Sequence, residues 1–197
     1  MLAAVILSGG ASRRMGSPKA LLPYQGRPFL EHLLDITKHP EIGARRVVLG
    51  ADAGPIINET ALPPEEIVIN HEWEKGQLSS IHAALHTLPP DADGILLLPV
   101  DHPLVSAALV SELIETFTQT GAPIVVPVYE GRRGHPVIFA ARLFPELLAA
   151  PMDKGARAVV WAHKDEIAEV PTNEEGCVLN LNDPDAFRKI SSGPPVT

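Results

Sequence analysis

Five short, largely apolar runs recur along the chain, and each is followed by a serine, a glycine, an asparagine or a proline. They occupy residues 3–7, 46–49, 67–69, 95–98 and 124–126. Short runs of this kind, rich in valine, isoleucine and leucine, are typical of strands that are buried on both faces. The pattern therefore predicts a sheet with at least these strands.

Between these runs, apolar residues recur every three or four positions in three segments. The positions are Phe29, Leu30, Leu33 and Leu34; Leu78, Ile81, Leu85 and Leu88; and Leu109, Leu113, Ile114 and Phe117. This spacing places the apolar side chains on one face of a helix. Buried strands that alternate with such helices favour a mainly parallel sheet covered on both sides. The predicted fold is α/β, a Rossmann-like three-layer sandwich.

The rest of the sequence gives no sign of a second domain. The 20 prolines are scattered at the ends of predicted elements, and no repeat or low-complexity tract is visible. Prolines in such positions are typical of stiff connections. We predict a single domain over residues 1–190 and a flexible tail over residues 191–197, where Ser, Gly and Pro dominate.

The composition favours a soluble protein with a sizeable core. Of the 197 residues, 45% are hydrophobic and 20% are charged, which excludes disorder as the main state. No apolar run approaches the roughly 20 residues of a membrane-spanning helix, and the N-terminal run lacks the basic flank of a signal peptide. We therefore expect a cytoplasmic protein without membrane contact. The single cysteine, Cys177, excludes an intramolecular disulfide and zinc sites built from several cysteines.

Charge is distributed unevenly along the chain. The net charge is −8, but residues 1–30 carry +4 and residues 31–197 carry −12. The acidic balance argues against nucleic-acid binding, which needs a basic surface. A small positive spot on an acidic body suits a phosphorylated small molecule held at one place. A solvated basic loop without a ligand is the alternative.

The positive spot coincides with a glycine-rich loop that follows the first predicted strand. The loop reads Leu7-Ser-Gly-Gly-Ala-Ser-Arg-Arg-Met-Gly-Ser-Pro-Lys19. Loops at the carboxyl ends of parallel strands form the ligand crevice of α/β folds. Glycines let backbone N–H groups approach an oxyanion, and Arg and Lys neutralise its charge. The loop predicts a triphosphate site, although it matches neither the GxxxxGK[ST] nor the GxGxxG pattern.

This loop resembles that of the MobA-like nucleotidyltransferases, which attach a nucleotide to the molybdenum cofactor; Ser8 stands where those proteins usually have alanine. Four further segments agree in the same order, namely Gly76-Gln-Leu-Ser-Ser-Ile81, Pro99-Val-Asp-His-Pro-Leu104, Gly134-His-Pro-Val-Ile-Phe139 and Asp153-Lys-Gly-Ala-Arg157. The resemblance implies a fold of the nucleotide-diphospho-sugar transferase type. The last two segments resemble the cytidylyltransferase branch, whereas the glycine pair after Ser8 favours the guanylyltransferase branch.

The resemblance also implies roles for individual residues. Those expected to bind the nucleotide or the acceptor are Leu7, Gly9, Gly10, Ser12, Arg13, Lys19, Gly76, Gln77, Ser79, Ser80 and His135. In this set the first loop holds the phosphates, residues 76–80 meet the base and ribose, and His135 lies on the acceptor side. Arg13, Lys19 and Asp101 form the expected catalytic set. Helix capping by Ser79 or Ser80 and a surface turn at His135 are the alternatives.

Asp101 is expected at the site from its own position as well. It closely follows the apolar run 95–98, so its carboxylate lies at the carboxyl end of a buried strand, where it faces the same crevice as the first loop. A carboxylate oxygen there suits Mg²⁺, with a cap or turn as the alternative. By resemblance, Asn182 is a second metal ligand; Asp183 is a possible substitute, and turn formation is the alternative.

Together these features predict a magnesium-dependent enzyme that transfers CMP from CTP to the phosphate of molybdopterin and releases pyrophosphate. Because the acceptor phosphate is already anionic, the enzyme has to align two polyanions and neutralise their repulsion. The alternatives are a GTP-dependent guanylyltransferase for the same cofactor, a nucleotidyltransferase for another phosphorylated acceptor, and a noncatalytic cofactor carrier. A recipient molybdoenzyme is a further expected partner.

Overall fold

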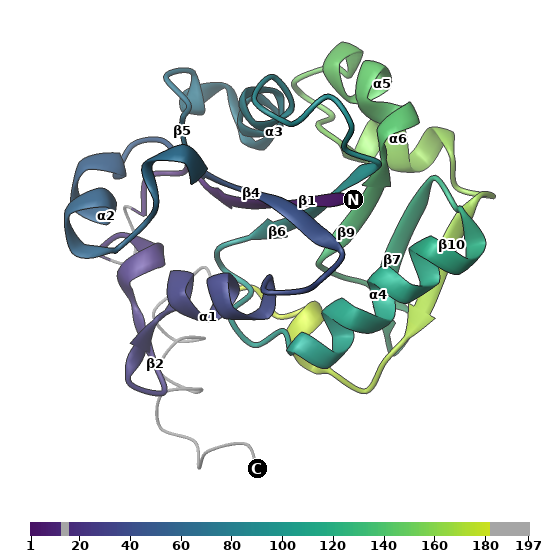
Figure 1. Ribbon diagram of the computed structural model, residues 1–197, viewed down its shortest axis with the longest axis horizontal. Coiled ribbons are helices and arrows are strands. Elements are labelled where there is room, and N and C mark those ends of the chain that lie inside the picture. The colour runs from purple at the N-terminus through teal and green to yellow at the C-terminus, as the bar shows by residue number, and fades with distance from the viewer. Residues whose placement is uncertain (13–15, 182–197) are drawn as a thin grey trace.

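The structure is a computed structural model that describes residues 1–12 and 16–181 (Figure 1). The strands are β1 (Leu2–Ser8), β2 (Pro23–Tyr24), β3 (Arg27–Pro28), β4 (Ile42–Leu49), β5 (Ile67–Ile69), β6 (Gly94–Pro99), β7 (Ile124–Tyr129), β8 (Arg132–Arg133), β9 (Val137–Ala140) and β10 (Ile167–Pro171). The α-helices are α1 (Phe29–Ile36), α2 (Ala53–Glu59), α3 (Gln77–Leu85), α4 (Ala107–Thr120), α5 (Phe144–Ala149) and α6 (Arg157–Ala162). Short 3-10 helices include Lys19–Leu21 and Trp73–Lys75.

One mixed sheet forms the centre of the molecule, with strand order β10-β7-β9-β6-β1-β4-β5 and β8 paired to β7. Strand β1 pairs in parallel with β4 and β6, and β4 pairs in parallel with β5. Strand β10 is parallel to β7, whereas β9 runs antiparallel to both β6 and β7. The carboxyl ends of β1, β4, β5 and β6 therefore meet at the same edge of the sheet.

Helices cover both faces of this sheet, with α1 and α4 on one side and α3, α5 and α6 on the other (Figure 1). The side chains of β1 alternate between the two layers. Leu2 and Ile6 belong to the apolar cluster that includes α1 and α4. Ala3, Val5 and Leu7 belong to the cluster that includes α3. Because both faces are covered, the strand is apolar along the whole run, as the sequence pattern predicted.

The predicted α/β three-layer architecture is confirmed. The five predicted strands are β1, β4, β5, β6 and β7, and the three predicted helices are α1, α3 and α4. Helix α3 ends at Leu85, one turn before the expected Leu88. Strands β2, β3, β8, β9 and β10 and helices α2, α5 and α6 were not predicted.

Among the residues that the structure describes, no helix has both the length and the apolar character needed to cross a membrane. The predicted tail over residues 191–197 and the predicted domain end at residue 190 lie outside the described residues. The single-domain prediction for residues 1–190 therefore stays a prediction.

Candidate functional site

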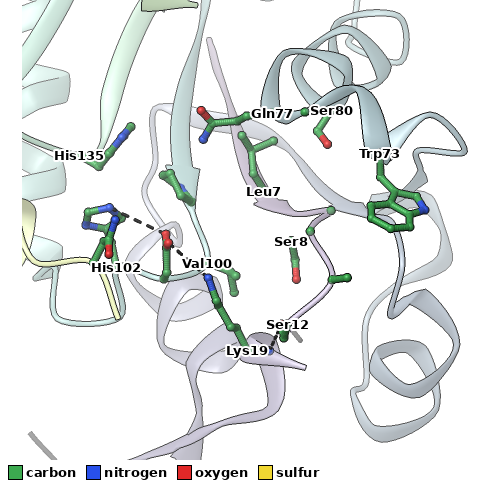
Figure 2. A pocket seen from close by; sticks show the side chains of 17 residues that line it. Leu7, Ser8, Ser12, Lys19, Trp73, Gln77, Ser80, Val100, His102 and His135 are labelled. Atoms are coloured by element: carbon green, nitrogen blue, oxygen red, sulfur yellow. Dashed lines mark hydrogen bonds and ion pairs between the residues drawn. The ribbon is translucent and has the colours of Figure 1, made fainter. Parts of the chain in front are cut away.

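A cavity of about 380 Å³ opens at the carboxyl ends of β1 and β6 (Figure 2). Its lining consists of Leu7, Ser8, Gly9, Gly10, Ala11, Ser12, Lys19, Trp73, Gly76, Gln77, Ser80, Pro99, Val100, Asp101, His102, His135 and Asn180. These residues come from the first loop, the start of α3, the turn after β6, the turn before β9 and a late segment. The volume lies within the range of small-molecule sites, roughly 300–1,000 Å³. The crevice predicted at the strand ends is therefore present.

The loop after β1 lies closely against the start of α3. A Cβ added at Gly9 would lie 2.6 Å from Ser80 Oγ, so a side chain there forces a shift. The Gly9 carbonyl also accepts a hydrogen bond from the Ala51 N–H, 3.2 Å away. At Gly10, in contrast, no atom of the described residues lies within 4 Å of an added Cβ. Gly9 is therefore tightly packed, whereas the described residues leave space beside Gly10.

Ser12 connects the first loop to Lys19. Its backbone N–H donates to Asp52 Oδ2 at 3.3 Å, and its Oγ accepts from the Lys19 backbone N–H at 2.9 Å. These bonds hold the start of the 3-10 helix in which Lys19 lies. Lys19 Nζ is 3.7 Å from Asp101 Oδ2 (Figure 2). Arg13 lies outside the described residues, so its expected role stays a prediction.

The turn after β6 brings Asp101 beside the first loop. The Val100 N–H donates to the Leu7 carbonyl at 2.9 Å, which extends the β1–β6 pairing to the edge of the pocket. Asp101 Oδ1 lies 3.9 Å from His102 Nε2. This separation and the 3.7 Å distance to Lys19 both exceed hydrogen-bond length. Asp101 therefore forms an ion pair with Lys19 without a direct hydrogen bond, on the wall of the pocket.

His102 and His135 form the wall of the pocket next to Asp101, with their ring centroids 4.9 Å apart. Burial lowers the pKa of His102. Burial, assisted by the neighbouring His102, lowers the pKa of His135 to about 4. Both imidazoles are therefore neutral near pH 7. In the described part of the lining, Lys19 supplies the positive charge and Asp101 the negative charge.

The start of α3 contributes a further part of the pocket wall. Gly76 has φ 98°, a left-handed conformation that favours glycine, and it precedes the first helical residue, Gln77. Gln77 and Ser80 line the cavity, as predicted. Gln77 is exposed and offers a neutral hydrogen-bonding group to a ligand, whereas Ser80 is buried and its Oγ accepts a hydrogen bond from Asn70 Nδ2 at 3.0 Å.

Ser79 is the one described residue of the expected binding set that the structure does not bring into the described lining. Its side chain is buried and points back into the preceding turn. The hydroxyl donates to the carbonyls of Gly76 at 2.8 Å and Glu72 at 3.0 Å. It accepts from Asn70 Nδ2 at 2.9 Å, and the same nitrogen lies 3.0 Å from Ser80 Oγ. Ser79 therefore stabilises the turn before α3, and its expected contact with the nucleotide stays a prediction.

The structure brings together most of the residues that the sequence singled out. The predicted residues in the lining are Leu7, Gly9, Gly10, Ser12, Lys19, Gly76, Gln77, Ser80, Asp101 and His135. Asn182 lies outside the described residues, and its role as a metal ligand stays a prediction. The lining residues that the prediction missed are Ser8, Ala11, Trp73, Pro99, Val100, His102 and Asn180. Among the missed residues, Trp73 is the one whose side-chain type most clearly suggests a binding role.

The donor set fits a hard divalent cation. No cluster of three His, Cys, Asp or Glu side chains suited to a metal occurs in residues 1–12 and 16–181. Asp101 offers one carboxylate, and Asn180 offers an amide oxygen in the same lining. Mg²⁺ is commonly held by one or two carboxylates together with phosphate oxygens of the substrate. The site therefore suits a cation that arrives with a phosphorylated ligand.

Comparison with known proteins finds one matching domain family and several named relatives. The MobA-like NTP transferase domain matches residues 4–167. Nicotine blue oxidoreductase of Paenarthrobacter nicotinovorans is 34% identical over 168 residues, which cover 78% of each chain. Molybdenum cofactor guanylyltransferase of Rhizobium meliloti is 35% identical over 166 residues, 83% of this chain and 69% of that protein.

Solved structures share the fold over nearly the whole chain. Rv0371c of Mycobacterium tuberculosis is 29% identical, with a TM-score of 0.82 over 98% of this chain and 99% of that chain. A complex of Rv0371c with manganese gives 26% identity and a TM-score of 0.79 over the same shares of the two chains. The predicted nucleotidyltransferase type of α/β fold is confirmed. With a domain match that spans most of its length, the chain belongs to the MobA-like NTP transferase family.

Proposed function

We propose that the protein transfers GMP from GTP to the phosphate of a molybdopterin-type acceptor, with Mg²⁺ as the metal. The observation that carries this proposal is the joint placement of the glycine loop, Lys19 and Asp101 in one cavity, with Lys19 Nζ 3.7 Å from Asp101 Oδ2. Phosphate transfer needs a positively charged side chain, a carboxylate that can hold a metal and backbone N–H groups of a loop that lines the pocket. A recipient molybdoenzyme is part of the same proposal.

The choice of GTP departs from the CTP donor expected from the sequence. Relatives named molybdenum cofactor guanylyltransferase support GTP. The segments that suggested CTP have structural explanations: a Cβ at Gly134 would lie 2.3 Å from the Cys177 carbonyl oxygen, and Gly155 occupies a turn at φ 65° before α6. Residues 153–157 are not part of the described pocket lining. These segments therefore carry little weight for the choice of base.

In the proposed reaction, an oxygen of the acceptor phosphate attacks the α-phosphorus of GTP. A new P–O bond forms as the bond between the α-phosphorus and the bridging oxygen breaks, and pyrophosphate leaves. Lys19 neutralises charge on the departing phosphates, and the loop amides at Gly9 and Gly10 orient them. Asp101, together with Asn180 in the same lining, would hold the metal ion. The bound metal would neutralise charge on the phosphates. The manganese complex of Rv0371c supports use of a divalent metal.

The neutral histidines fit this reaction without acting as bases. A phosphate acceptor is anionic before it attacks, so no proton has to be removed from it. Burial keeps the pKa of His135 at about 4, and such an imidazole is a weak base. We assign His102 and His135 to the wall on the acceptor side of the pocket.

The test is pyrophosphate release in the presence of Mg²⁺, molybdopterin and one triphosphate at a time. GTP is expected to give the highest rate, and chelation of the metal with EDTA is expected to stop it. A higher rate with CTP would overturn the proposed donor and leave the transferase reaction intact. Release only with a different phosphorylated acceptor would overturn molybdopterin as the substrate. Binding of the cofactor without any pyrophosphate would indicate a carrier.

The relative named nicotine blue oxidoreductase raises a second candidate, a redox function. Its identity to this chain is similar to that of the guanylyltransferase of Rhizobium meliloti, so identity does not separate the two. The reaction products distinguish the two functions, because electron transfer releases no pyrophosphate. Reduction of nicotine blue without pyrophosphate release from any triphosphate would favour the redox function.

A further inference from the structure

We propose that Trp73 is the stacking surface for the base of the donor nucleotide, an inference that rests on the proposed function. Trp73 begins the 3-10 helix Trp73–Lys75, which is followed by the glycine that opens α3. It is partly buried and belongs to the lining of the pocket. Figure 2 shows it at the opposite end of the pocket from His102 and His135. The two histidines and Trp73 therefore lie at opposite ends of the pocket.

The base of the Trp73 side chain is held in place by two glycines from neighbouring strand ends. A Cβ added at Gly50, which follows β4, would lie 2.7 Å from Trp73 Cβ. A Cβ added at Gly9 would lie 4.0 Å from the same atom. The Gly76 N–H donates to the Trp73 carbonyl at 3.1 Å, which closes the turn. The backbone and Cβ of Trp73 are therefore positioned before a ligand arrives, so only the side-chain torsions of the indole remain to be ordered on binding.

The surroundings of the indole suit a nucleobase. Gln77 and Ser80, at the start of α3, supply neutral polar groups near it, while the described charged groups of the lining, Lys19 and Asp101, lie with the phosphate-binding elements. Figure 2 shows Ser80 between Trp73 and Gln77. A flat, uncharged surface beside neutral hydrogen-bonding groups matches the flat face and polar edge of a base. The triphosphate then extends along the first loop toward Lys19.

Stacking of this kind contributes to binding and not to the chemical step. Trp73 lies apart from Lys19, the residue proposed to neutralise the leaving phosphates (Figure 2). Loss of the indole should therefore raise KM and leave kcat nearly unchanged. A purine offers a larger face than a pyrimidine. Loss of the indole is therefore expected to weaken GTP binding more than CTP binding.

The first test uses the fluorescence of Trp73. The chain has two tryptophans, and the second, Trp161 in α6, is 59% exposed and not part of the described pocket lining. The Trp161→Phe variant therefore reports on Trp73 alone. GTP should quench its emission, whereas inorganic tripolyphosphate, which has no base, should leave it nearly unchanged. GTP that binds by equilibrium dialysis without altering the emission would overturn the stacking and leave the proposed function standing. If no triphosphate binds, both are wrong.

The second test uses Trp73→Ala and Trp73→Phe in the full chain. The alanine variant is expected to raise KM for GTP about tenfold, and phenylalanine should restore most of the loss because it keeps an aromatic face. Inhibition by tripolyphosphate should be the same as in the parent protein. Equal weakening of GTP and tripolyphosphate would overturn the proposal, because it would show that the variant disturbs the phosphate loop.

Discussion

The Asp101 carboxylate lies 3.7 Å from Lys19 Nζ and 3.9 Å from His102 Nε2, and neither contact is a hydrogen bond. Its side chain is 16% exposed, on the wall of the pocket. The ion pair with Lys19 lacks a direct hydrogen bond, so it should stabilise the fold less than a hydrogen-bonded buried pair would. The carboxylate lines the pocket, where a metal could meet it. At the scale of single residues, a change at Asp101 is therefore expected to reduce activity without a matching loss of stability.

For Asp101→Asn, turnover is expected to fall by at least about a hundredfold, because the amide keeps the shape of the side chain but not the charge that holds the metal. The melting temperature should be close to that of the parent. Pyrophosphate release and thermal unfolding measure the two effects. Asp153→Asn, in an exposed turn outside the described lining, is the matched control. Near-normal turnover of Asp101→Asn at low Mg²⁺ would show that Asp101 is structural.

For Lys19→Met, kcat should fall by on the order of 10²–10³, while KM for GTP changes less. Charge builds on the leaving phosphates as the bond breaks, so a cation aimed there acts mainly in the transition state. Lys164→Met removes the same charge from an exposed position outside the described lining, and it should change neither parameter appreciably. Steady-state kinetics with GTP measure kcat and KM for the parent and both variants. A raised KM at unchanged kcat would mean that Lys19 only anchors the substrate.

The stability of the fold should depend on His135 at acidic pH. Its pKa is about 4 in the folded protein, below the ordinary value of 6.5. The unfolded chain therefore takes up a proton at higher pH than the folded one, and stability is lost as the pH falls from about 6.5 toward about 4. Urea unfolding of the parent and of His135→Asn at neutral and acidic pH measures this. The parent should lose more stability than the variant between the two pH values; equal losses would contradict the pKa assignment.

At the scale of elements, the site depends on how closely the first loop approaches α3. Ser80 Oγ occupies the space into which a side chain at Gly9 would project, but Ser80 Cβ is 3.8 Å away, an ordinary contact distance. The Ser80 hydroxyl is therefore the group that limits how closely the first loop approaches α3. The sequence indicated the glycine loop and the start of α3 separately, whereas their contact depends on the sheet that places them together.

Gly9→Ala is expected to destabilise the protein by about 1–3 kcal/mol, because the added methyl displaces the loop or the Ser80 side chain. Adding Ser80→Ala removes the hydroxyl and should recover most of that loss, so the two changes are non-additive. Gly10→Ala, whose Cβ meets no described atom within 4 Å, is the control for loop stability. The free energy of unfolding in urea measures the parent and all of these variants. Additive effects of Gly9→Ala and Ser80→Ala would show that the two residues do not contact each other.

Prediction of elements succeeded where the pattern was long or continuous. Strands β1 and β6 and helix α4 have uninterrupted apolar runs or clear helical spacing. Strand β9 has four residues, and β8 consists of the exposed two-residue segment Arg132–Arg133. Helices α5 and α6 have six residues each. Short elements depend more on tertiary contacts than on a local pattern, although the three-residue strand β5 was predicted from its apolar run.

At the scale of the whole molecule, the parallel pairing of β4, β1 and β6 explains why the site could be predicted at all. Residues that follow different strands of such a sheet converge at its carboxyl edge, so the first loop and Asp101 were expected together. Trp73 was not expected, because its position depends on packing against Gly50 after β4. Ser79 and Ser80 could not be told apart in the sequence, because which serine faces the pocket depends on the orientation of α3.

In the proposed reaction the α-phosphate of GTP is transferred to the acceptor with the nucleoside, and transfer of a radioactive label measures this step. The protein is incubated with Mg²⁺, molybdopterin and GTP that carries radioactive phosphorus at either the α- or the γ-position. We predict that the α-label appears in the modified cofactor and the γ-label in pyrophosphate, in equal amounts. Release of the γ-label as inorganic phosphate, or failure of the α-label to join the cofactor while GTP is consumed, would contradict the proposed reaction.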